Sequence, residues 1–171
     1  MQIIAQLFGI GAMISLFLIY QQKSRKKLII AKLSADIFWV AHYFCLGGYA
    51  GMIPNFVGIF RELVFINRER KKWASYFFWP ILFILINWGL GLRTFNAWYN
   101  LLPITASTFV TISLWINNPK ITKIISIPIS TAFLIYDIFI NSYIGIINEA
   151  ISICSIVIYF LKQKGENKNV K

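Results

Sequence analysis

The segment Asn67-Arg-Glu-Arg-Lys-Lys72 places four basic residues between two long apolar stretches. Three other basic clusters recur in the same way, after the first, fifth and seventh of seven hydrophobic stretches: Lys23, Arg25, Lys26, Lys27; then Lys120, Lys123; then Lys162, Lys164, Lys168, Lys171. The alternate loops, near 46–48, 93–96 and 141–142, contain only Arg93. Because cytoplasmic loops of membrane proteins carry an excess of Lys and Arg, this alternation predicts several membrane spans with every basic cluster on one side.

The seven hydrophobic stretches each have a length suited to crossing a bilayer as a helix. Such a helix needs about 20 largely apolar residues, with a range of roughly 17–25. The predicted spans are 3–20, 28–46, 49–66, 73–92, 97–116, 121–140 and 143–161. They use most of the 171 residues, of which 58% are hydrophobic. The predicted fold class is therefore an all-α polytopic membrane protein with seven transmembrane helices, and any site must lie among the helices or at their ends.

The charge distribution also predicts orientation and partners. The positive-inside rule places the N-terminus outside and the C-terminus in the cytoplasm. A net charge of +11 would suggest nucleic acid for a soluble protein, but here the basic residues are confined to short loops without an RNA-binding motif. The expected partner is the lipid bilayer, with its anionic headgroups, and no nucleic acid. The first stretch lacks a basic n-region and a convincing cleavage site, so we expect a retained helix rather than a signal peptide.

Motifs for catalysis and for cofactor or metal binding are missing from the sequence. It contains no Gly-x-Ser-x-Gly, no phosphate-binding Gly-rich loop and no His-Glu-x-x-His. Cys45 and Cys154 fall at different depths and give neither a disulfide framework nor metal-ligand spacing. We therefore expect no enzymatic activity, no cofactor and no metal.

An internal repeat is present against the apolar background. When the chain is shifted by 94 residues, its landmarks coincide without a gap: Gly9 with Pro103, Lys26 with Lys120, Trp39 with Phe133, Tyr49-Ala-Gly-Met-Ile53 with Tyr143-Ile-Gly-Ile-Ile147, and Arg68 and Arg70 with Lys162 and Lys164. Identity is low, but the aligned basic loops and the shared Tyr-x-Gly-x-Ile fix a register. Since internal repeats are common in transporter folds, a duplication is the favoured interpretation.

Each repeat contains three spans, so two units fused directly would point in opposite directions. The span at 73–92 matches nothing in either repeat and reverses the chain. The prediction is a 3+1+3 layout of two parallel three-helix bundles, related by an axis along the membrane normal. The expected division is a first repeat at 1–72, a linker helix at 73–96, a second repeat at 97–162 and a disordered cytoplasmic tail at 163–171.

The first repeat in particular resembles the YgjV-type bacterial inner membrane proteins. The resemblance is carried by the pattern Asp36, Trp39, His42-Tyr43, Gly47, Asn55 and Arg61. The layout of the chain from about 7 to 160 is broadly similar to the SWEET, PQ-loop and nicotinamide-riboside carriers. The resemblance implies a multi-pass protein of the bacterial inner membrane and solute transport. The sequence departs from these carriers in that the Pro-Gln pair is absent, with Gly9-Ile10 in the first repeat and Pro103-Ile104 in the second. Only the second repeat therefore has a proline at that register, and the Trp-x-x-x-Trp signature of the nicotinamide-riboside carriers is missing.

Four of the six acidic residues lie inside the predicted spans: Asp36, Glu62, Asp137 and Glu149. Ionisable groups in membrane helices are costly and normally pair with one another. By helical rise, Asp36 and Arg61 lie roughly 12 and 7–8 Å from the basic ends of their spans. Their side chains can therefore meet if the two helices are neighbours. A structural ion pair that locks two helices together is favoured over a ligand site.

Asn55 and Glu149 are equivalent under the 94-residue shift, each roughly 9 Å below the non-basic start of its span. Asn148 is adjacent, and His42 lies at a comparable depth. In SWEET-like carriers the solute sits between equivalent third helices, so the resemblance points to a substrate pathway at His42, Asn55, Asn148 and Glu149. Interhelical hydrogen bonds are an equally good explanation of these residues. For His42 alone, hydrogen-bonded packing is favoured over metal binding.

The expected function is that of a carrier or facilitator for a small polar metabolite, sugar-like or nucleoside- or vitamin-like, along a path between the two bundles. The alternative is a non-transporting receptor or an accessory subunit of a larger membrane complex, because the fold does not fix the function. Binding without translocation would distinguish the two. The sequence does not determine the identity of the solute, its ion coupling or whether the protein forms a homo-oligomer.

Overall fold

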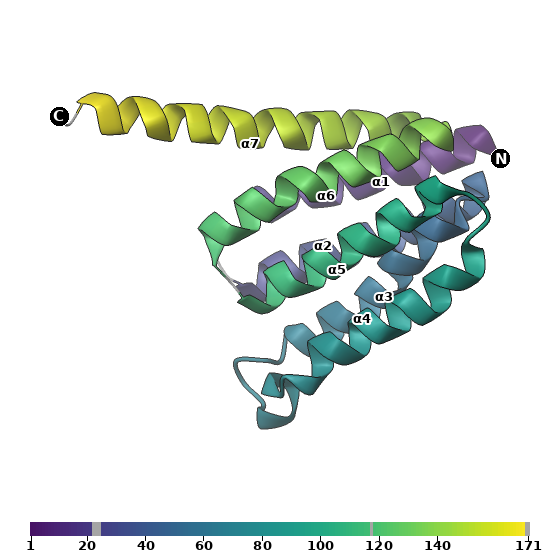
Figure 1. Cartoon of the computed structure of the whole chain (residues 1–171), viewed down its shortest axis with the longest axis horizontal. Helices are drawn as coiled ribbons and strands as arrows, with labels where there is room; N and C mark the ends of the chain where they lie inside the picture. The colour runs from purple at the N-terminus through teal and green to yellow at the C-terminus, as the bar shows by residue number, and fades with distance from the viewer. Residues whose placement is uncertain (22–24, 117, 170–171) are drawn as a thin grey trace.

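The computed structural model describes residues 1–21, 25–116 and 118–169, and Figure 1 shows them as a bundle of helices. The helices in these ranges are α1 (Gln2–Gln21), α2 (Arg25–Leu46), α3 (Tyr49–Phe65), α4 (Phe78–Gly91), α5 (Leu101–Ile116), α6 (Pro119–Phe139) and α7 (Tyr143–Asn169), with short 3-10 helices η1 (Lys72–Ser75), η2 (Leu92–Thr94) and η3 (Trp98–Asn100). No strand occurs among these residues. The predicted all-α fold class is confirmed.

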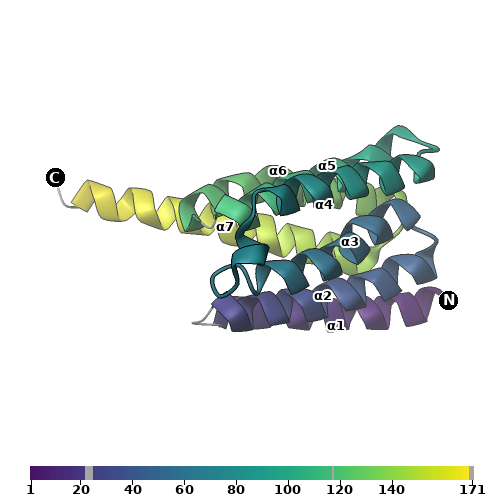
Figure 2. The ribbon, with the colours of Figure 1, turned by 90° about the horizontal axis from the view of Figure 1, so that it is seen from below.

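Successive helices run in opposite directions, so that α1, α3, α5 and α7 share one direction (Figures 1 and 2). The starts of α2 and α6 and the α3–α4 connection, which contains Arg68 and Lys72, lie together at what we call the basic end. The N-terminus and the α2–α3, α4–α5 and α6–α7 connections lie at the opposite end. Lys23 and Lys171 of the predicted basic clusters lie outside the described residues. Which end faces the cytoplasm stays a prediction.

The helices form two units that meet along two helix pairs. In the first unit α2 packs between α1 and α3, and in the second unit α6 packs between α5 and α7. The units meet where α3 packs against α5 and where α1 packs against α7, while α4 packs on both α3 and α5. Under the 94-residue shift the α3–α5 contact is equivalent to the α7–α1 contact. The duplicated 3+1+3 arrangement remains a prediction, and this packing agrees with it.

The starts of equivalent helices follow the same register. Helix α3 begins at Tyr49 and α7 at Tyr143, while α2 begins at Arg25 and α6 at Pro119. Each pair is separated by the 94 residues that the sequence comparison gave. Tyr49 and Tyr143 both begin their helices at the opposite end, as two parallel units require.

The distribution of side chains is that of a protein in lipid. Large apolar residues such as Leu7, Phe60, Leu85 and Ile158 are exposed, whereas Asp36, His42 and Asp137 are fully buried. Four of the described helical segments are long and apolar enough to cross a membrane: 29–46, 98–116, 121–139 and 143–161. Two shorter apolar segments lie at 2–18 and 78–94. Helix α3, with 17 residues, is not among these six segments, and its span remains a prediction.

Two boundaries differ from those predicted. The fourth helix begins at Phe78 instead of residue 73, because Tyr76 is extended and Pro80 is tolerated only in a first helical turn. The Trp79 indole N–H donates to the Trp73 carbonyl (2.7 Å) across this break. Helix α7 continues to Asn169, through residues for which the sequence predicts a disordered tail, because Lys162, Gln163 and Glu166 are good helix formers. Figure 1 shows α7 extending beyond the bundle at the basic end.

Candidate functional site

A cluster of four charged residues, Lys32, Asp36, Arg61 and Glu62, lies inside the bundle between α2 and α3. We call it the charged cluster. Asp36, Arg61 and Glu62 are at most 2% exposed. The Lys32 ammonium forms a salt bridge with Asp36 one helical turn away, and Arg61 Nη2 lies 3.9 Å from Asp36 Oδ2. Arg61 also donates to Glu62 Oε1 from Nη2 (3.0 Å) and from Nε (3.3 Å).

The charged cluster ties three helices together. Arg61 Nη1 donates to the Thr111 hydroxyl on α5 (2.9 Å), and Thr111 in turn donates to the Ser107 carbonyl (2.8 Å). Gly58 allows Asp36 to lie against α3, since a Cβ at residue 58 would be 2.4 Å from Asp36 Oδ2. Two carboxylates face two cations, so the cluster is electrically balanced. Buried ion pairs of this kind hold geometry and become costly when one partner is removed.

A second cluster lies one helical turn from the end of α2 and joins the two units. It consists of His42, Tyr43, Tyr136, Asp137 and Ser142, all at most 3% exposed, and we call it the cross-unit cluster. The Tyr43 hydroxyl donates to Asp137 Oδ1 (3.0 Å). His42 Nε2 lies 2.7 Å from the Ser142 hydroxyl, and His42 Nδ1 lies 2.6 Å from the Ala5 carbonyl oxygen. This cluster therefore binds α1 and α2 to α6 and to the α6–α7 connection.

The contacts of the cross-unit cluster are reciprocal under the 94-residue shift. Tyr43 and Asp137 are equivalent positions that bind each other. His42 reaches the residue before α7, and its equivalent Tyr136 reaches the start of α3, where its hydroxyl accepts from the Gly51 N–H (2.9 Å). A two-fold axis passing between Tyr43 and Asp137 would produce contacts of this kind. The charged cluster has no such counterpart, because the equivalents of its four members are Ser126, Ser130, Ser155 and Ile156.

Equivalent glycines make room for the cross-unit contacts. At Gly145 on α7 a Cβ would lie 2.4 Å from Asp137 Oδ2 and 2.4 Å from Ser142 Oγ. At Gly51 on α3 a Cβ would lie 2.6 Å from a ring carbon of Tyr136 and 3.1 Å from one of Tyr43. These two residues are the glycines of the Tyr-x-Gly-x-Ile sequence shared by the repeats. The shared motif thus serves the close approach of the two units.

The residues of the predicted substrate pathway lie on three helices. His42 is fully buried with both ring nitrogens in hydrogen bonds, so it holds helices in place in this conformation. The Asn55 amide is half-buried and donates to the Gly51 carbonyl of its own helix (2.8 Å). Asn148 donates to its neighbour Glu149 (2.9 Å). Asn55 and Glu149 occupy equivalent turns of α3 and α7.

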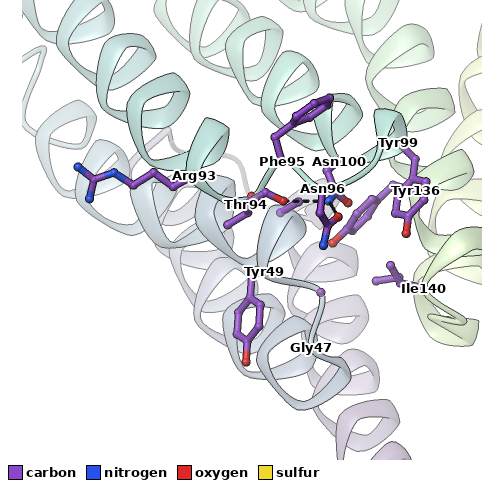
Figure 3. Close-up of a pocket in the computed structure, with 12 residues that line it drawn as sticks. Gly47, Tyr49, Arg93, Thr94, Phe95, Asn96, Tyr99, Asn100, Tyr136 and Ile140 are labelled. Atoms are coloured by element: carbon purple, nitrogen blue, oxygen red, sulfur yellow. Dashed lines mark hydrogen bonds between the residues drawn. The ribbon is translucent and has the colours of Figure 1, made fainter.

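A pocket of about 350 Å³ opens at the opposite end, between the α2–α3 turn, the α4–α5 connection and the end of α6 (Figure 3). Its lining comes from both units: Gly47, Gly48, Tyr49, Ala50, Arg93, Thr94, Phe95, Asn96, Tyr99, Asn100, Tyr136 and Ile140. No acidic side chain is among them, and Arg93 is the one cation. The four residues of the predicted pathway do not line this pocket.

The sequence did not predict the pocket or the role of Asp137 and Ser142. Loop residues such as Asn96 and Asn100 carry no recognisable motif, and the Asn100 amide binds the Thr94 carbonyl (2.9 Å) only once the connection has folded. His42 and Ser142 are 100 residues apart in the chain. The signal that would have found them is the 94-residue shift itself, which aligns His42 with Tyr136, Tyr43 with Asp137 and Gly48 with Ser142.

Comparisons with known proteins give the family. Residues 3–166 match the sequence profile of the Imp-YgjV family, described as a bacterial inner membrane protein. The chain therefore belongs to this family of multi-pass inner membrane proteins, as its sequence pattern indicated. No curated protein and no solved structure matches the chain.

Proposed function

We propose that this inner membrane protein is a carrier, without enzymatic activity, for a small polar solute that passes between the two three-helix units. The observation that carries the proposal is the pocket at the opposite end, because residues of both units line it. Pockets of about 300–1,000 Å³ are the usual size of small-molecule sites. Side-chain amides, hydroxyls and aromatic rings line this one, which suits a solute that both stacks and forms hydrogen bonds.

The polar residues beyond the pocket support a path that continues into the bundle. The Asn55 amide donates to the Gly51 carbonyl. The N–H of the same Gly51 donates to the hydroxyl of Tyr136, which lines the pocket. Glu149 occupies the equivalent turn of α7, with Asn148 as its hydrogen-bond partner. Since polar groups inside a membrane protein are expensive, their placement at matched positions in both units fits a translocation route. In this conformation both ring nitrogens of His42 are in hydrogen bonds with Ala5 and Ser142, so His42 does not bind solute.

The proposed orientation has the basic end in the cytoplasm and the pocket open to the outside, following the positive-inside rule. It is tested with Arg70→Cys at the basic end and Phe95→Cys at the opposite end, in a background with Cys45→Ser and Cys154→Ser. An impermeant thiol reagent applied to intact spheroplasts should label residue 95 and leave residue 70 unlabelled. The reverse pattern would contradict the proposed orientation.

The carrier proposal is tested by uptake. Cells with and without the protein are compared in untargeted metabolite uptake, and the solute that differs is then measured with Glu149→Gln and with Asn55→Leu. We expect both variants to reduce uptake at least tenfold at equal membrane abundance. Glu69→Gln, an exposed carboxyl in the α3–α4 connection, is the matched control and should transport normally. Normal uptake by both pathway variants would remove the path from consideration.

A non-transporting receptor or accessory subunit is the second candidate. The charged cluster, which ties α2, α3 and α5 together with hydrogen bonds and ion pairs, is what favours it, since a rigid interior suits a scaffold. In that case the pocket would bind its solute without moving it. Purified protein in vesicles distinguishes the two: a carrier equilibrates a trapped solute across the bilayer, whereas a receptor binds it with no change in the trapped amount.

A further inference from the structure

The connection between α3 and α4 at the basic end contains three consecutive exposed cations, Arg70, Lys71 and Lys72, which we call the basic turn. None of the three forms a salt bridge with a described residue. Glu69 is the one acidic residue in the connection, and four cations against one carboxylate give the segment 67–72 a net charge of +3. The contacts within the described part of the chain therefore leave the basic turn able to bind an external anion.

Hydrogen bonds and burial hold the backbone of the basic turn in place. The Lys71 N–H donates to the Asn67 carbonyl (2.9 Å), and the Ala74 N–H donates to the Lys71 carbonyl (3.1 Å). Ala74 is fully buried, and the Trp79 indole N–H donates to the Trp73 carbonyl (2.7 Å) just beyond it. The cations are therefore presented on a folded segment that is anchored to the bundle on its C-terminal side.

Apolar side chains continue from the basic turn along α4. Four aromatic side chains follow the cations in the chain and are 43–66% exposed: Trp73, Tyr76, Phe77 and Phe78. On α4, Phe78, Ile81 and Leu85 are three and four positions apart, so they share one helix face, and each is at least 45% exposed. Helix α4 packs on α3 and α5 at an edge of the bundle (Figure 1), which leaves this face turned to lipid. Trp and Tyr are enriched where a membrane meets water, so the segment passes from headgroup level into the hydrocarbon region.

We propose that the α3–α4 connection is a binding site for an anionic phospholipid. The cations of the basic turn bind the headgroup phosphate, and the acyl chains lie on the exposed apolar face of α4. Basic groups beside a membrane helix are a recognised feature of sites for anionic headgroups. The apolar face favours a lipid over free phosphate, because free phosphate has nothing to place on it. The site lies at the basic end, away from the solute pocket, and does not depend on the carrier proposal.

Neighbouring cations at the basic end have different surroundings. Arg68 already has a partner within the chain, since its guanidinium lies 3.9 Å from the centre of the Trp115 ring and donates to the Trp115 carbonyl. Lys26 and Lys27 at the start of α2 are exposed, but the next aromatic residue along the chain is Phe38. This pair carries two exposed positive charges without a run of exposed rings beside them in the chain, and so provides a matched control for the basic turn.

Native mass spectrometry of the full-length protein in neutral detergent tests the site by counting bound lipids. The anionic probe is tetraoleoyl cardiolipin, and the neutral probe is dioleoyl phosphatidylcholine, which we expect to bind much more weakly. Lys71→Gln combined with Lys72→Gln should weaken cardiolipin binding about tenfold or more, whereas Lys71→Arg with Lys72→Arg should retain it. The control, Lys26→Gln with Lys27→Gln, makes the same change in net charge and should bind cardiolipin as the wild type does.

An equal loss of cardiolipin in the two glutamine variants would show attraction by net charge alone and would overturn the site. Displacement of cardiolipin by millimolar inorganic phosphate would also overturn it, because the cations would then serve a soluble anion. In detergent without cardiolipin both variants should unfold as the wild type does, since the substituted side chains are exposed. If the variant at residues 71 and 72 does not fold, Trp73→Ala decides the outcome: it keeps the cations and removes an exposed ring, and unchanged cardiolipin binding would contradict the proposal.

Discussion

The charged cluster and the cross-unit cluster both include a residue of α2, Asp36 and His42, which are six positions apart. The two clusters accommodate buried ionisable groups in different ways. In the charged cluster, the cations of Lys32 and Arg61 lie within salt-bridge distance of the carboxyl groups of Asp36 and Glu62. In the cross-unit cluster, Asp137 accepts from the Tyr43 hydroxyl, its Oδ2 has no hydrogen-bond partner, and it forms no salt bridge with a described Lys or Arg. The first is suited to a permanent lock, whereas the second joins the units through single hydrogen bonds around a carboxyl group that faces no cation.

The two clusters also differ in symmetry. The contacts of the cross-unit cluster recur under the 94-residue shift, whereas the charged residues of the first unit align with neutral residues in the second. A contact on a two-fold axis opens equally for both units. The charged cluster lies on α2 and α3 of the first unit and also reaches α5 of the second through Thr111, so it holds the first unit rigid and ties it to the second. Substitutions in the two clusters should therefore have different consequences.

Arg61→Met should be the most destabilising change. It removes the central cation from two buried carboxylates, and breaking a buried pair in this way costs about 3–5 kcal/mol. The free energy of unfolding in mixed micelles measures it. Arg70→Met, an exposed arginine at the basic end, is the control and should change stability by less than about 0.5 kcal/mol. Equal stability of the two variants would show that the charged cluster is not a lock.

The same chemical change should separate the two clusters at their aspartates. Asp36→Asn leaves an excess of buried positive charge and should cost about 1.5–3 kcal/mol, the scale for hydrogen bonds to charged groups. Asp137→Asn keeps the shape of the side chain and an oxygen that can accept from the Tyr43 hydroxyl, so it should cost less than about 1 kcal/mol. Unfolding of both variants under identical conditions gives the comparison. A larger loss at residue 137 would mean that Asp137 is ionised and paired.

Gly145→Ala tests the close approach of the units. Its Cβ would lie 2.4 Å from both Asp137 and Ser142, and overpacking of this kind costs about 1–3 kcal/mol. Gly89→Ala on α4 is the matched control, since a Cβ there has nothing within 4 Å, and it should be neutral or slightly stabilising. A Gly145→Ala protein as stable as Gly89→Ala would contradict the tight contact.

Tyr43→Phe should have the smallest effect. It removes one hydrogen bond to Asp137, and interhelical hydrogen bonds in membranes average about 0.6 kcal/mol. The ring contacts with Trp39 and Tyr136 remain. The expected result is a small loss of stability, measured by unfolding in mixed micelles. A loss above about 2 kcal/mol would assign Tyr43 a larger structural role than one hydrogen bond, since the largest such bonds measured are near 1.7 kcal/mol.

The sequence predicted the parts of the fold that depend on local pattern. Apolar length and basic loops gave the helices, and helical rise placed Asp36 and Arg61 near enough to meet, as the 3.9 Å distance shows. The start of α4 was misplaced because Trp73 and Phe77 are apolar enough for a helix, and only the backbone around Tyr76 breaks it. The apolar periodicity of the sequence does not indicate such a break in the helix before a proline.

The candidate site was harder to predict because it depends on how helices far apart in the chain are placed. His42 was expected beside Asn55 and Glu149 from depth alone, but depth does not determine which face of a helix points at which neighbour. The structure turns His42 toward Ala5 and Ser142. Asp137 was noted as a buried acid, and its partner Tyr43 was visible only as an equivalent position in the repeat. The repeat therefore held more information about the site than any local motif.

The most direct test of the difference between the two clusters is a pair of distance measurements by pulsed electron spin resonance. Spin labels at residues 49 and 143 report on the opposite end, and labels at residues 63 and 157 report on the basic end. All four side chains are exposed and each pair is equivalent under the shift. Gly145→Ala, which crowds the cross-unit cluster, should widen the 49–143 distance and leave the 63–157 distance unchanged, whereas Gly89→Ala should change neither. An unchanged 49–143 distance, or movement at the basic end instead, would contradict the account.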